Sequence, residues 1–550
     1  MSEEPAFKFL NDAQWLFLSW MAAFTIVIVY STYLGLGRRL RQIICLDKPV
    51  QTYFFKPNKL HAAFKCHLLD APCFRSRRFQ PFKILQRLPI GNLPGRCETL
   101  YLLIHFLVNV LLHVKSVDWG DKNSIVATLR SRSGTLSTLH IFAALVLSSR
   151  HNPLATLCGL SRNTIKTLHH WFGRIAIFDT VVHMAAHLAF EIRTTGFSSA
   201  LESLHRSTFL LSGTIGMLAA ILISVQTVAL FRHTAYELFF LLHIVLVAVI
   251  MAGVYIHCRT GGLVQLLVVR CSISIWIFER LLRLICVCFR STGSGGLCAM
   301  VEISHDDVLR IRLQNARPWR AQPGEYIYLT LPRIALGTSH PFSVAWTETQ
   351  PSPAINLLVR RRSGFTKKLF DATASMPERK FTTAALIEGP YGRENLSSYG
   401  TVILFAAGIG ITHHMQQILH LVRSHMDCTA AVRRITLVWA MRSMQDFEWA
   451  RQWLVEVVEN HGPQNRILST LLFITKPGTG LGRPFDGYPA QVYLGRPNFK
   501  VLLEQLMHKD GGAAAVSVCG PGGFADDVCK AVRSLHPVWN VDLFVQGGLY

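Results

Sequence analysis

The chain separates by its hydropathy pattern into a first half of long apolar runs and a second half of short ones. The long runs lie near residues 15–36, 98–114, 134–149, 165–191, 207–231, 236–257 and 261–285. Each is about 17–25 residues long, the length that crosses the hydrocarbon core of a bilayer as an α-helix. We therefore predict about seven transmembrane helices. The acidic N-terminus lacks the basic segment of a secretory signal, so we expect the first run to be a retained helix.

The second half of the chain follows a Gly/Ser spacer, STGSGG, at residues 291–296. Residues 298–398 contain short alternating stretches such as VLRIRL between Pro and Gly turns, a pattern typical of a small antiparallel β-barrel. In residues 399–550 apolar strands alternate with helical patterns, which predicts an α/β domain with a mostly parallel sheet. The expected order is an N-terminal helix with a basic loop (1–97), a transmembrane helical bundle (98–290), and these two domains.

Composition supports a membrane protein and changes how the charge is interpreted. Half of the residues are hydrophobic and 16% are charged, against about 25% charged in soluble domains. In a soluble protein the net charge of +23 would suggest a polyanionic partner. Here thirteen Lys and Arg face only two acids between residues 37 and 97, so this loop is predicted to be cytosolic. We prefer contact with anionic lipids and a topology signal over a specific partner, and we predict no nucleic-acid binding.

The cysteines and the number of spans indicate on which side of the membrane each part of the chain lies. The 13 cysteines form no CxxC pair, which argues against a disulfide scaffold and for a reducing environment. With the basic loop inside and seven spans, the N-terminus is expected outside and the C-terminal half in the cytosol.

Histidines recur inside the predicted membrane helices at a matched spacing. His169 and His183 lie fourteen residues apart in one run, and His243 and His257 lie fourteen apart two runs later. On an α-helix such a pair falls within about 40° of one face and about 21 Å apart along the axis. Helices separated by one crossing run parallel, so the pairs can face each other at two levels. Two facing imidazoles suit the axial positions of a haem, which predicts two haems.

Other interpretations of these histidines remain open. A single intramembrane histidine is more often a packed core residue, and a structural zinc site needs four clustered ligands. The register is also open, because His170 neighbours His169 and His187 lies one turn beyond His183. The histidines without a matching partner are interpreted as structural: His105, His113 and His140. Arg174 and Asp179, in the same run, suit haem propionates, contacts between helices or a wet cavity.

Two motifs in the β-rich region suit a flavin. HPFSVAW (340–346) can place backbone groups and a hydroxyl against an isoalloxazine ring, although a buried strand and turn explains it equally well. RRRSGFTKKL (360–369) surrounds Gly364 and Thr366 with basic residues that suit a pyrophosphate; a solvated basic turn is the alternative.

Three features of the α/β region suit a nucleotide. FAAGIGIT (405–412) is a strand, a glycine turn and a helix start, where amides bind phosphate, but it lacks the third glycine of GxGxxG. Arg442 follows the next strand, where a base favours the 2′-phosphate of NADPH; a solvated arginine is nearly as plausible. VCGPGGF (518–524) repeats the strand–glycine–helix device and places Cys519 at a strand end, as an ordinary tight turn would also do.

Taken together, these motifs resemble the fungal-type ferric/cupric reductases, in the superfamily that also contains the NADPH oxidases. The resemblance runs from about Pro94 to the C-terminus and is carried by RSGTLS (132–137), RHNPL (150–154), LHHWFGR, YELFF, HPFSVAW, GIGITHH and CGPGG. It implies a transmembrane domain with two b-type haems coupled to an FAD- and NADPH-binding module.

The resemblance also assigns individual residues. It implies His169 with His243 for the inner haem and His183 with His257 for the outer haem. The flavin and nucleotide residues it implies are His340, Pro341, Phe342, Ser343, Gly408, Gly410, Thr412, Cys519, Gly520 and Pro521, with Tyr550 as a terminal aromatic at the flavin. Hydride transfer is expected near Cys519 and Ser343.

The function expected from the sequence is transmembrane electron transfer. Electrons from cytosolic NADPH would pass through FAD and the haems to an external ferric or cupric chelate, most plausibly at the plasma membrane and beside an iron permease or oxidase. One alternative keeps this pathway but reduces oxygen to superoxide. A second is a haem-containing membrane transporter or sensor with an inactive flavodomain.

Overall fold

The computed structural model describes residues 5–46, 49–74, 77–84, 88–91, 93–115, 117–228, 236–293, 296–305, 307–335, 337–348, 351–459, 467–476 and 488–546. Its contacts divide the chain into two compact units. The membrane unit comprises Met1–Leu34 and Pro81–Leu282, and the C-terminal unit comprises Gly35–Gln80 and Arg283–Tyr550. The end of the first helix and the basic segment that follows it, up to Gln80, therefore group with the C-terminal half.

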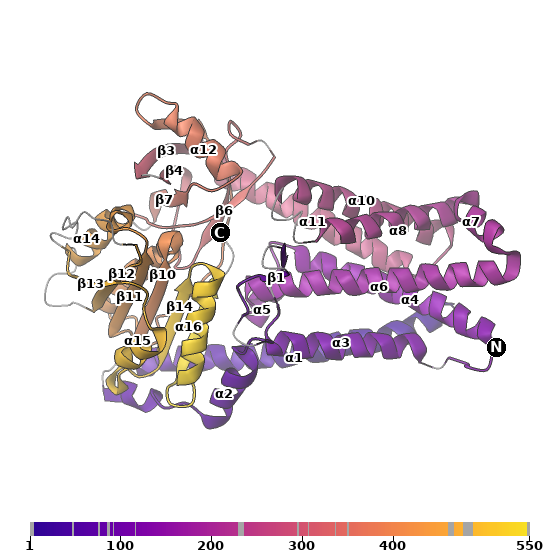
Figure 1. Cartoon of the computed structure of the whole chain (residues 1–550), viewed down its shortest axis with the longest axis horizontal. Helices are drawn as coiled ribbons and strands as arrows, with labels where there is room; N and C mark the ends of the chain where they lie inside the picture. The colour runs from indigo at the N-terminus through magenta and orange to yellow at the C-terminus, as the bar shows by residue number, and fades with distance from the viewer. Residues whose placement is uncertain are drawn as a thin grey trace. The chain divides into compact units, whose positions relative to one another are not determined.

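Long helices build the membrane unit. They are α1 (Pro5–Ile44), α3 (Arg96–Val114), α4 (Lys122–Ser148), α6 (Arg162–Thr195), α8 (Thr208–Gln226), α10 (Tyr236–Thr260) and α11 (Leu266–Ser291), with the shorter α5 (Pro153–Cys158) and α7 (Phe197–Arg206) and the strands β1 (Phe82–Ile84) and β2 (Leu88–Gly91). Helix α4 packs along α6, and α8 packs along α10 (Figure 1). Helices α1 and α11 continue into the C-terminal unit.

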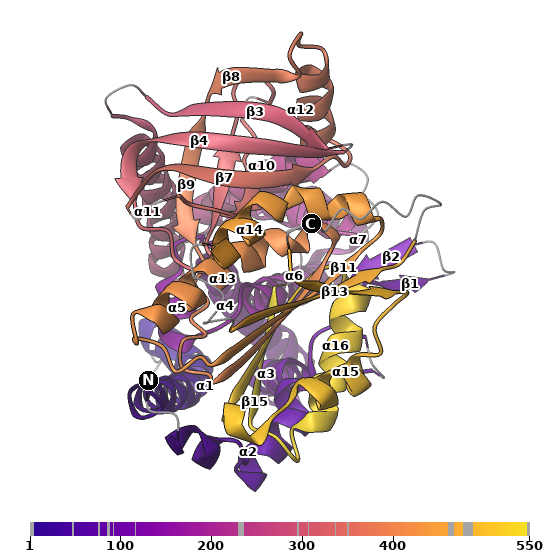
Figure 2. The same ribbon diagram turned by 90° about the vertical axis from the view of Figure 1, so that its left-hand side faces the viewer.

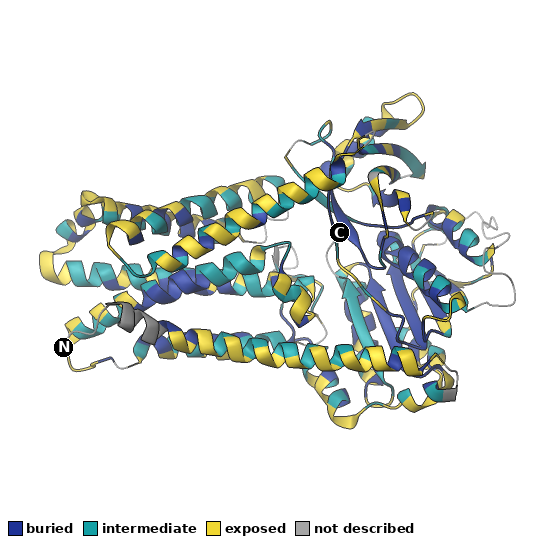
Figure 3. Ribbon diagram, turned by 180° about the vertical axis from the view of Figure 1, so that it is seen from behind, coloured by how far each residue is buried: buried dark blue, intermediate teal, exposed yellow. Residues whose placement is uncertain are grey.

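Five helices within the described residues are long and apolar enough to cross a membrane. They are Ala13–Ile44, Arg96–Val114, Arg162–Thr195, Thr208–Gln226 and Tyr236–Thr260. The other two predicted spans are also helical, as α4 and α11, but neither helix is among those long and apolar enough to cross a membrane. The predicted number of seven spans is therefore not confirmed. Many large apolar side chains of α1, α3, α8 and α10 are exposed, as expected of surfaces that face lipid (Figure 3).

Glycine allows α8 and α10 to approach closely. A Cβ added at Gly253 of α10 would lie 2.8 Å from Ser212 O and 3.2 Å from the Cα of Gly216, both on α8. Small residues at such contacts are typical of membrane helix pairs. This packing fixes the position of α10, which carries His243 and His257.

The β-rich part of the C-terminal unit contains two antiparallel sheets. The four-stranded sheet has the order β7 (Ser352–Arg360), β4 (Val308–Trp319), β3 (Cys298–His305) and β8 (Lys380–Ala384). The three-stranded sheet has the order β6 (His340–Ser343), β5 (Tyr326–Thr330) and β9 (Leu386–Tyr391). One helix, α12 (Phe365–Ala374), lies at the end of the larger sheet (Figure 2). Because the strands pair as two sheets, the predicted single barrel is not confirmed.

The α/β part contains the predicted parallel sheet. Its order is β13 (Ala490–Leu494), β12 (Leu468–Ile474), β11 (Arg434–Met441), β10 (Thr401–Ala407), β14 (Ala514–Cys519) and β15 (Val541–Gln546), and every pairing is parallel. The helices are α13 (Ile411–Met426), α14 (Arg451–Glu459), α15 (Phe499–Leu506) and α16 (Gly522–Leu535), with the short turns η3 (Gly408–Gly410), η4 (Met444–Trp449) and η6 (Lys509–Gly511). The central strands are buried on both faces (Figure 3), which explains their continuous apolar sequence.

The 35–80 segment packs onto this α/β part. It contains η1 (Pro49–Phe54), α2 (Lys59–Phe64) and η2 (Lys65–Leu69). Lys65, Arg38 and Arg41 all form ion pairs with Asp542 of β15, whose carboxylate also accepts a hydrogen bond from the Tyr399 hydroxyl. Several basic residues that we assigned to anionic lipids thus bind a carboxylate of the protein itself.

The end of the same segment binds helix α16. The Asp526 carboxylate accepts hydrogen bonds from the backbone amides of Arg78, Phe79 and Gln80 at 2.9–3.0 Å. A Cβ added at Gly522, at the start of α16, would lie 2.4 Å from Phe79 O. Only glycine allows this close approach.

Candidate functional site

Two pairs of histidine rings face each other between α6 and α10. The ring centroids of His169 and His243 are 6.3 Å apart, with an interplanar angle of 68°. Those of His183 and His257 are also 6.3 Å apart, with an angle of 87°. The structure therefore brings together the histidines that share the spacing of fourteen, at two levels of the bundle.

Hydrogen bonds orient these rings. In three of them Nδ1 lies within hydrogen-bond distance of a backbone carbonyl: His169 with Ala144 (2.9 Å), His183 with Arg130 (2.7 Å) and His257 with Phe209 (2.9 Å). His243 Nδ1 lies 3.4 Å from the side-chain amide of Gln226. Because a carbonyl only accepts, Nδ1 carries the proton in the first three, which leaves Nε2 as a free electron-pair donor. This is the usual arrangement of histidines that ligate a metal.

Glycines on the neighbouring helices make room for the second pair. A Cβ added at Gly134 of α4 would lie 3.0 Å from His183 Nδ1. A Cβ added at Gly213 of α8 would lie 2.9 Å from His257 Nδ1. Phe209 stacks on His257 with centroids 4.0 Å apart. These contacts hold each imidazole in one orientation.

The spare histidines have different surroundings. His170 is exposed, and its ring centroid lies 5.9 Å from that of His169. His187 Nε2 is buried without a hydrogen-bond partner among the described residues. Arg174 is exposed and lies over the ring of Trp171 at 4.7 Å. Within the described residues no group of three or more His, Cys, Asp or Glu is arranged to hold a metal ion, so the zinc alternative finds no support.

The predicted flavin motifs adjoin each other. Residues His340, Pro341, Phe342 and Ser343 form strand β6, which pairs with β5. The His340 ring stacks on that of Phe365, the first residue of α12, with centroids 4.3 Å apart. Gly364 precedes this helix with φ of +67°, and the Thr366 hydroxyl accepts from the Arg362 amide at 2.9 Å. The start of strand β6 therefore lies beside a helix N-terminus, where backbone amides attract phosphate.

The two predicted nucleotide loops lie side by side. Strands β10 and β14 are neighbours, with Ala406 paired to Cys519. A Cβ added at Gly410 would lie 2.2 Å from Cys519 O, and one added at Gly520 would lie 2.9 Å from the Cβ of Ala407. Glycine is required at both positions for the loops to touch. Cys519 is fully buried at the strand end, and Pro521 precedes α16.

The remaining predicted residues lie in different places. Thr412, Gly408 and Arg442 follow strands β10 and β11 of the parallel sheet. Thr412 is the second residue of α13, and its hydroxyl donates to Ile409 O at 3.0 Å. Gly408 O accepts from the Trp439 indole at 2.9 Å. Arg442 follows β11, and its backbone amide donates to Asp446 at 2.9 Å. Ser343 and Cys519 belong to different sheets. Tyr550 lies outside the described residues.

A largely buried carboxylate between α13 and β14 was not predicted. Glu394 lies 3.4 Å from His413 Nε2 on α13 and accepts from Ser517 of β14 at 2.5 Å. Burial opposes ionisation of Glu394, but these contacts outweigh it and lower the pKa of the carboxyl. The Glu394 carboxylate thus links α13, which follows the first glycine loop, to β14, which precedes the second. In the sequence, the adjacent histidines of the GIGITHH motif could have indicated a buried polar contact at this place.

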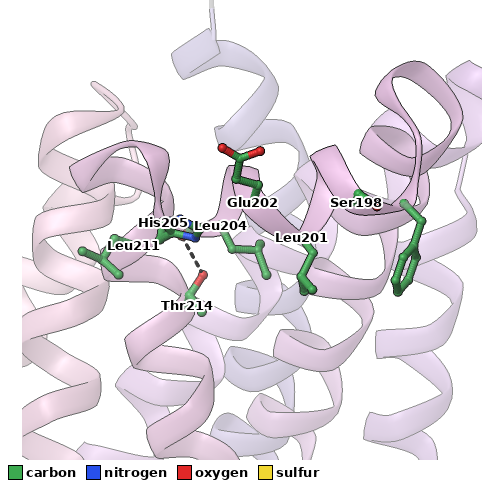
Figure 4. A pocket seen from close by; sticks show the side chains of 8 residues that line it. Ser198, Leu201, Glu202, Leu204, His205, Leu211 and Thr214 are labelled. Carbon is green, nitrogen blue, oxygen red and sulfur yellow. Dashed lines mark hydrogen bonds between the residues drawn. The ribbon is translucent and has the colours of Figure 1, made fainter.

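A pocket of ≈ 570 Å³ opens beside the His183–His257 level of the membrane unit. It is lined by Phe197, Ser198, Leu201, Glu202, Leu204, His205, Leu211 and Thr214, from α7 and α8 (Figure 4). Leu211 and Thr214 flank Gly213, which contacts the His257 ring. The pocket is therefore close to the second histidine pair.

Comparison with known families agrees with this order of parts. Residues 133–254 match the model of the ferric reductase like transmembrane component, 294–395 match an FAD-binding domain, and 399–480 match the ferric reductase NAD binding domain. The chain belongs to the ferric reductase family. As a member of that family it is a multi-pass membrane protein with FAD-binding and NAD-binding domains.

Named members of the ferric reductase family align over most of this chain. It is 27% identical to ferric/cupric reductase transmembrane component 1 of Candida albicans, over 85% of this chain and 64% of that protein. It is 24% identical to ferric/cupric reductase transmembrane component 2 of Saccharomyces cerevisiae, over 84% of this chain and 67% of that protein. A probable cell surface ferric reductase of Aspergillus oryzae is 26% identical, over 67% and 50% of the two chains. The chain thus spans about two thirds or less of the length of these relatives.

Proposed function

We propose that this chain is a transmembrane ferric or cupric reductase that takes electrons from NADPH. The observation that carries the proposal is the pair of matched histidine couples, at two levels of a helical bundle, in a chain that also holds flavin and nucleotide domains. A separation of 6.3 Å accommodates one metal ion between two imidazoles with bonds of about 2 Å. The two relatives named as ferric/cupric reductases support a metal acceptor.

Each group of residues has a role in this proposal. His169 with His243 and His183 with His257 would hold two b-type haems through Nε2, with Nδ1 fixed by the surrounding backbone. Strand β6 and the start of α12 would hold FAD. The loops around Gly410 and Cys519 would hold the nucleotide phosphates and the nicotinamide. When bound, these groups would split a hydride into single electrons and relay them across the membrane.

We place the flavin and nucleotide domains in the cytosol and the His183–His257 level toward the outside, at the plasma membrane. The burial of Cys519 where the paired loops meet would limit loss of electrons to side reactions. A separate permease or oxidase would then take up the reduced metal. The decisive experiment measures ferric-chelate reduction at the cell surface with NADPH, together with a reduced-minus-oxidised haem spectrum. A haem spectrum with superoxide formation and no chelate reduction would instead support an oxidase.

Arg442 is expected to select NADPH over NADH. Replacing Arg442 with alanine removes a cation at the end of β11, where the 2′-phosphate would lie. A lost hydrogen bond to a charged group costs about 1.5–3 kcal/mol, so the NADPH preference should fall by roughly 10–100-fold, measured as the ratio of kcat/KM values. Arg434→Ala, an exposed arginine at the other end of the same strand, should leave the ratio unchanged. An unchanged ratio in Arg442→Ala would rule out this role.

The α7–α8 pocket is expected to admit the acceptor. Leu201→Trp fills the pocket and should raise KM for the ferric chelate by roughly tenfold, because it displaces contacts worth about 1–2 kcal/mol. The haem spectrum should stay unchanged. Leu218→Trp, at an exposed position of α8 outside the pocket, is the matched control. Equal KM values in both variants would place the acceptor elsewhere.

A further inference from the structure

A buried polar cluster lies among helices α3, α4 and α6. Asp179 of α6 is fully buried, and its Oδ1 accepts a hydrogen bond from Asn109 Nδ2 at 2.8 Å. His140 Nδ1 lies 2.9 Å from Asp179 Oδ2, and His113 Nε2 lies 3.5 Å from Oδ1. His105 extends the cluster, with its Nε2 3.0 Å from His140 Nε2. His105, His113 and His140, the three histidines that had no matching partner in the sequence, thus lie together in one cluster around the Asp179 carboxylate.

The hydrogen bonds determine where the protons of two histidines stand. His140 Nδ1 lies 2.8 Å from Leu136 O. A carbonyl can only accept, so Nδ1 carries a proton and donates it to Leu136 O, while Asp179 Oδ2 lies 2.9 Å from the same nitrogen. His140 Nε2 can then accept a hydrogen bond from His105 Nε2. Both rings are satisfied in their neutral forms.

Without an additional proton, His113 and Asp179 cannot form a hydrogen bond with each other. His113 Nδ1 lies 2.9 Å from Asn109 O and so carries a proton. In the neutral ring, Nε2 would then present a lone pair to the carboxylate. Among the described residues, His113 Nε2 is a buried atom without a hydrogen-bond partner, and the Asp179 oxygen that faces it is Oδ1, at 3.5 Å. A proton held between His113 Nε2 and Asp179 Oδ1 would give Nε2 a partner and balance the charge of the carboxylate.

Other polar groups border the cluster on each neighbouring helix. From α1, the Trp20 ring lies 6.0 Å from His140, and from α3 the Tyr101 ring stacks on His105 at 6.0 Å. The buried Arg132 of α4 donates to Leu112 O at 3.3 Å. A buried carboxylate is costly in a membrane unless it is paired or protonated, so this cluster must exchange a proton or keep a fixed pair.

The cluster lies between the two histidine pairs along both helices that it shares with them. On α4, His140 lies between Gly134, which contacts His183, and Ala144, whose carbonyl contacts His169. On α6, Asp179 lies between His169 and His183 in sequence. A negative charge that arrives at either pair would therefore raise the proton affinity of the cluster, because charges interact strongly in a medium of low dielectric constant.

We propose that Asp179 and His113 form a proton-binding site that compensates the charge of electrons crossing the membrane unit. One proton from solvent binds between the carboxylate and Nε2 when one electron enters the bundle from the flavin domain. The same proton is released when the electron passes to the external acceptor. The inference rests on the proposed function, since it requires an electron in the bundle.

The test is the pH dependence of the haem midpoint potential in the full-length protein, measured by spectroelectrochemistry. The unmodified protein should show a slope approaching ~59 mV per pH unit, the value for one proton per electron. Asp179→Asn keeps the shape and removes the proton site, so its slope should fall toward zero. Infrared difference spectra should show a carboxyl band that appears on reduction and is absent from Asp179→Asn.

Two further variants make the result decisive if Asp179→Asn does not fold. His113→Gln removes the other proton acceptor and should also flatten the slope. Ser137→Ala removes a hydrogen bond between α4 and α6, to Thr180, without removing a titratable group, and should keep the slope. Equal slopes in the unmodified protein, His113→Gln and Asp179→Asn would overturn this inference, whereas absence of any haem spectrum would overturn the proposed function.

Discussion

The variant His183→Ala is expected to lose one of two haems and all reduction of metal outside the membrane. On the proposed function, the substitution removes one of the two imidazoles, His183 and His257, that would hold a haem and whose ring centroids lie 6.3 Å apart. The alanine also leaves space beside Gly134, where the imidazole is packed. NADPH should still reduce the bound flavin, because the C-terminal unit is unchanged. The measurements are the dithionite-reduced haem absorbance, which should fall by about half, and surface ferric reduction, which should be lost.

The neighbouring histidines are the matched controls for this experiment. His170→Ala and His187→Ala remove imidazoles from the same helix that do not face α10 histidines in a ring pair. Both should keep the full haem absorbance. Full absorbance in His183→Ala together with a loss in His187→Ala would move the ligand by one turn and contradict the pairing.

The variant Asp542→Ala is expected to destabilise the C-terminal unit strongly. It leaves Lys65 and Arg41 mostly buried without their counter-charge and removes the acceptor of the Tyr399 hydroxyl. Breaking a buried ion pair costs about 3–5 kcal/mol, which corresponds to a midpoint of thermal unfolding roughly 10 °C lower. Release of bound flavin on heating gives the measurement. Asp527→Ala, at an exposed position of α16, should change the midpoint little.

The same carboxylate predicts how stability depends on pH. Burial opposes ionisation of Asp542, but Lys65 and Arg38 outweigh it and hold the pKa of the carboxyl well below its usual range. Its contribution to stability is therefore complete above the unfolded-state pKa, about 3.9. It is lost as the pH falls further toward the depressed pKa of the folded state. Acid should narrow the difference between Asp542→Ala and the unmodified protein, and a constant difference down to low pH would contradict the ion pairs.

The elements that could be predicted from the sequence are those in which a type of residue or element repeats at a regular spacing along the chain. The spacing of fourteen between His169 and His183 marks one helix face, and the alternation of strands and helices after residue 399 gives the parallel sheet. Pairings of the β strands depend on contacts between distant segments, so the sequence pattern does not determine them, and the predicted single barrel is not confirmed.

The contacts that were missed join residues far apart in the chain. Asp179 binds Asn109 from another helix, and Asp542 binds Lys65 from a segment that precedes it by more than four hundred positions. No pattern within either segment indicates its partner. The basic residues between positions 37 and 97 were interpreted as a membrane-surface loop because charge alone does not distinguish a lipid phosphate from a buried carboxylate.

The docking of the 35–80 segment has a practical consequence for expression. A fragment that starts at residue 283 would look like a complete flavin and nucleotide module by its family matches. Yet it would expose the Asp542 carboxylate and the amide-binding Asp526, both of which are covered by residues upstream of the membrane bundle. A water-soluble version of this module must therefore be assembled from two discontinuous pieces of chain, with residues 35–80 supplied by a linker or as a separate peptide.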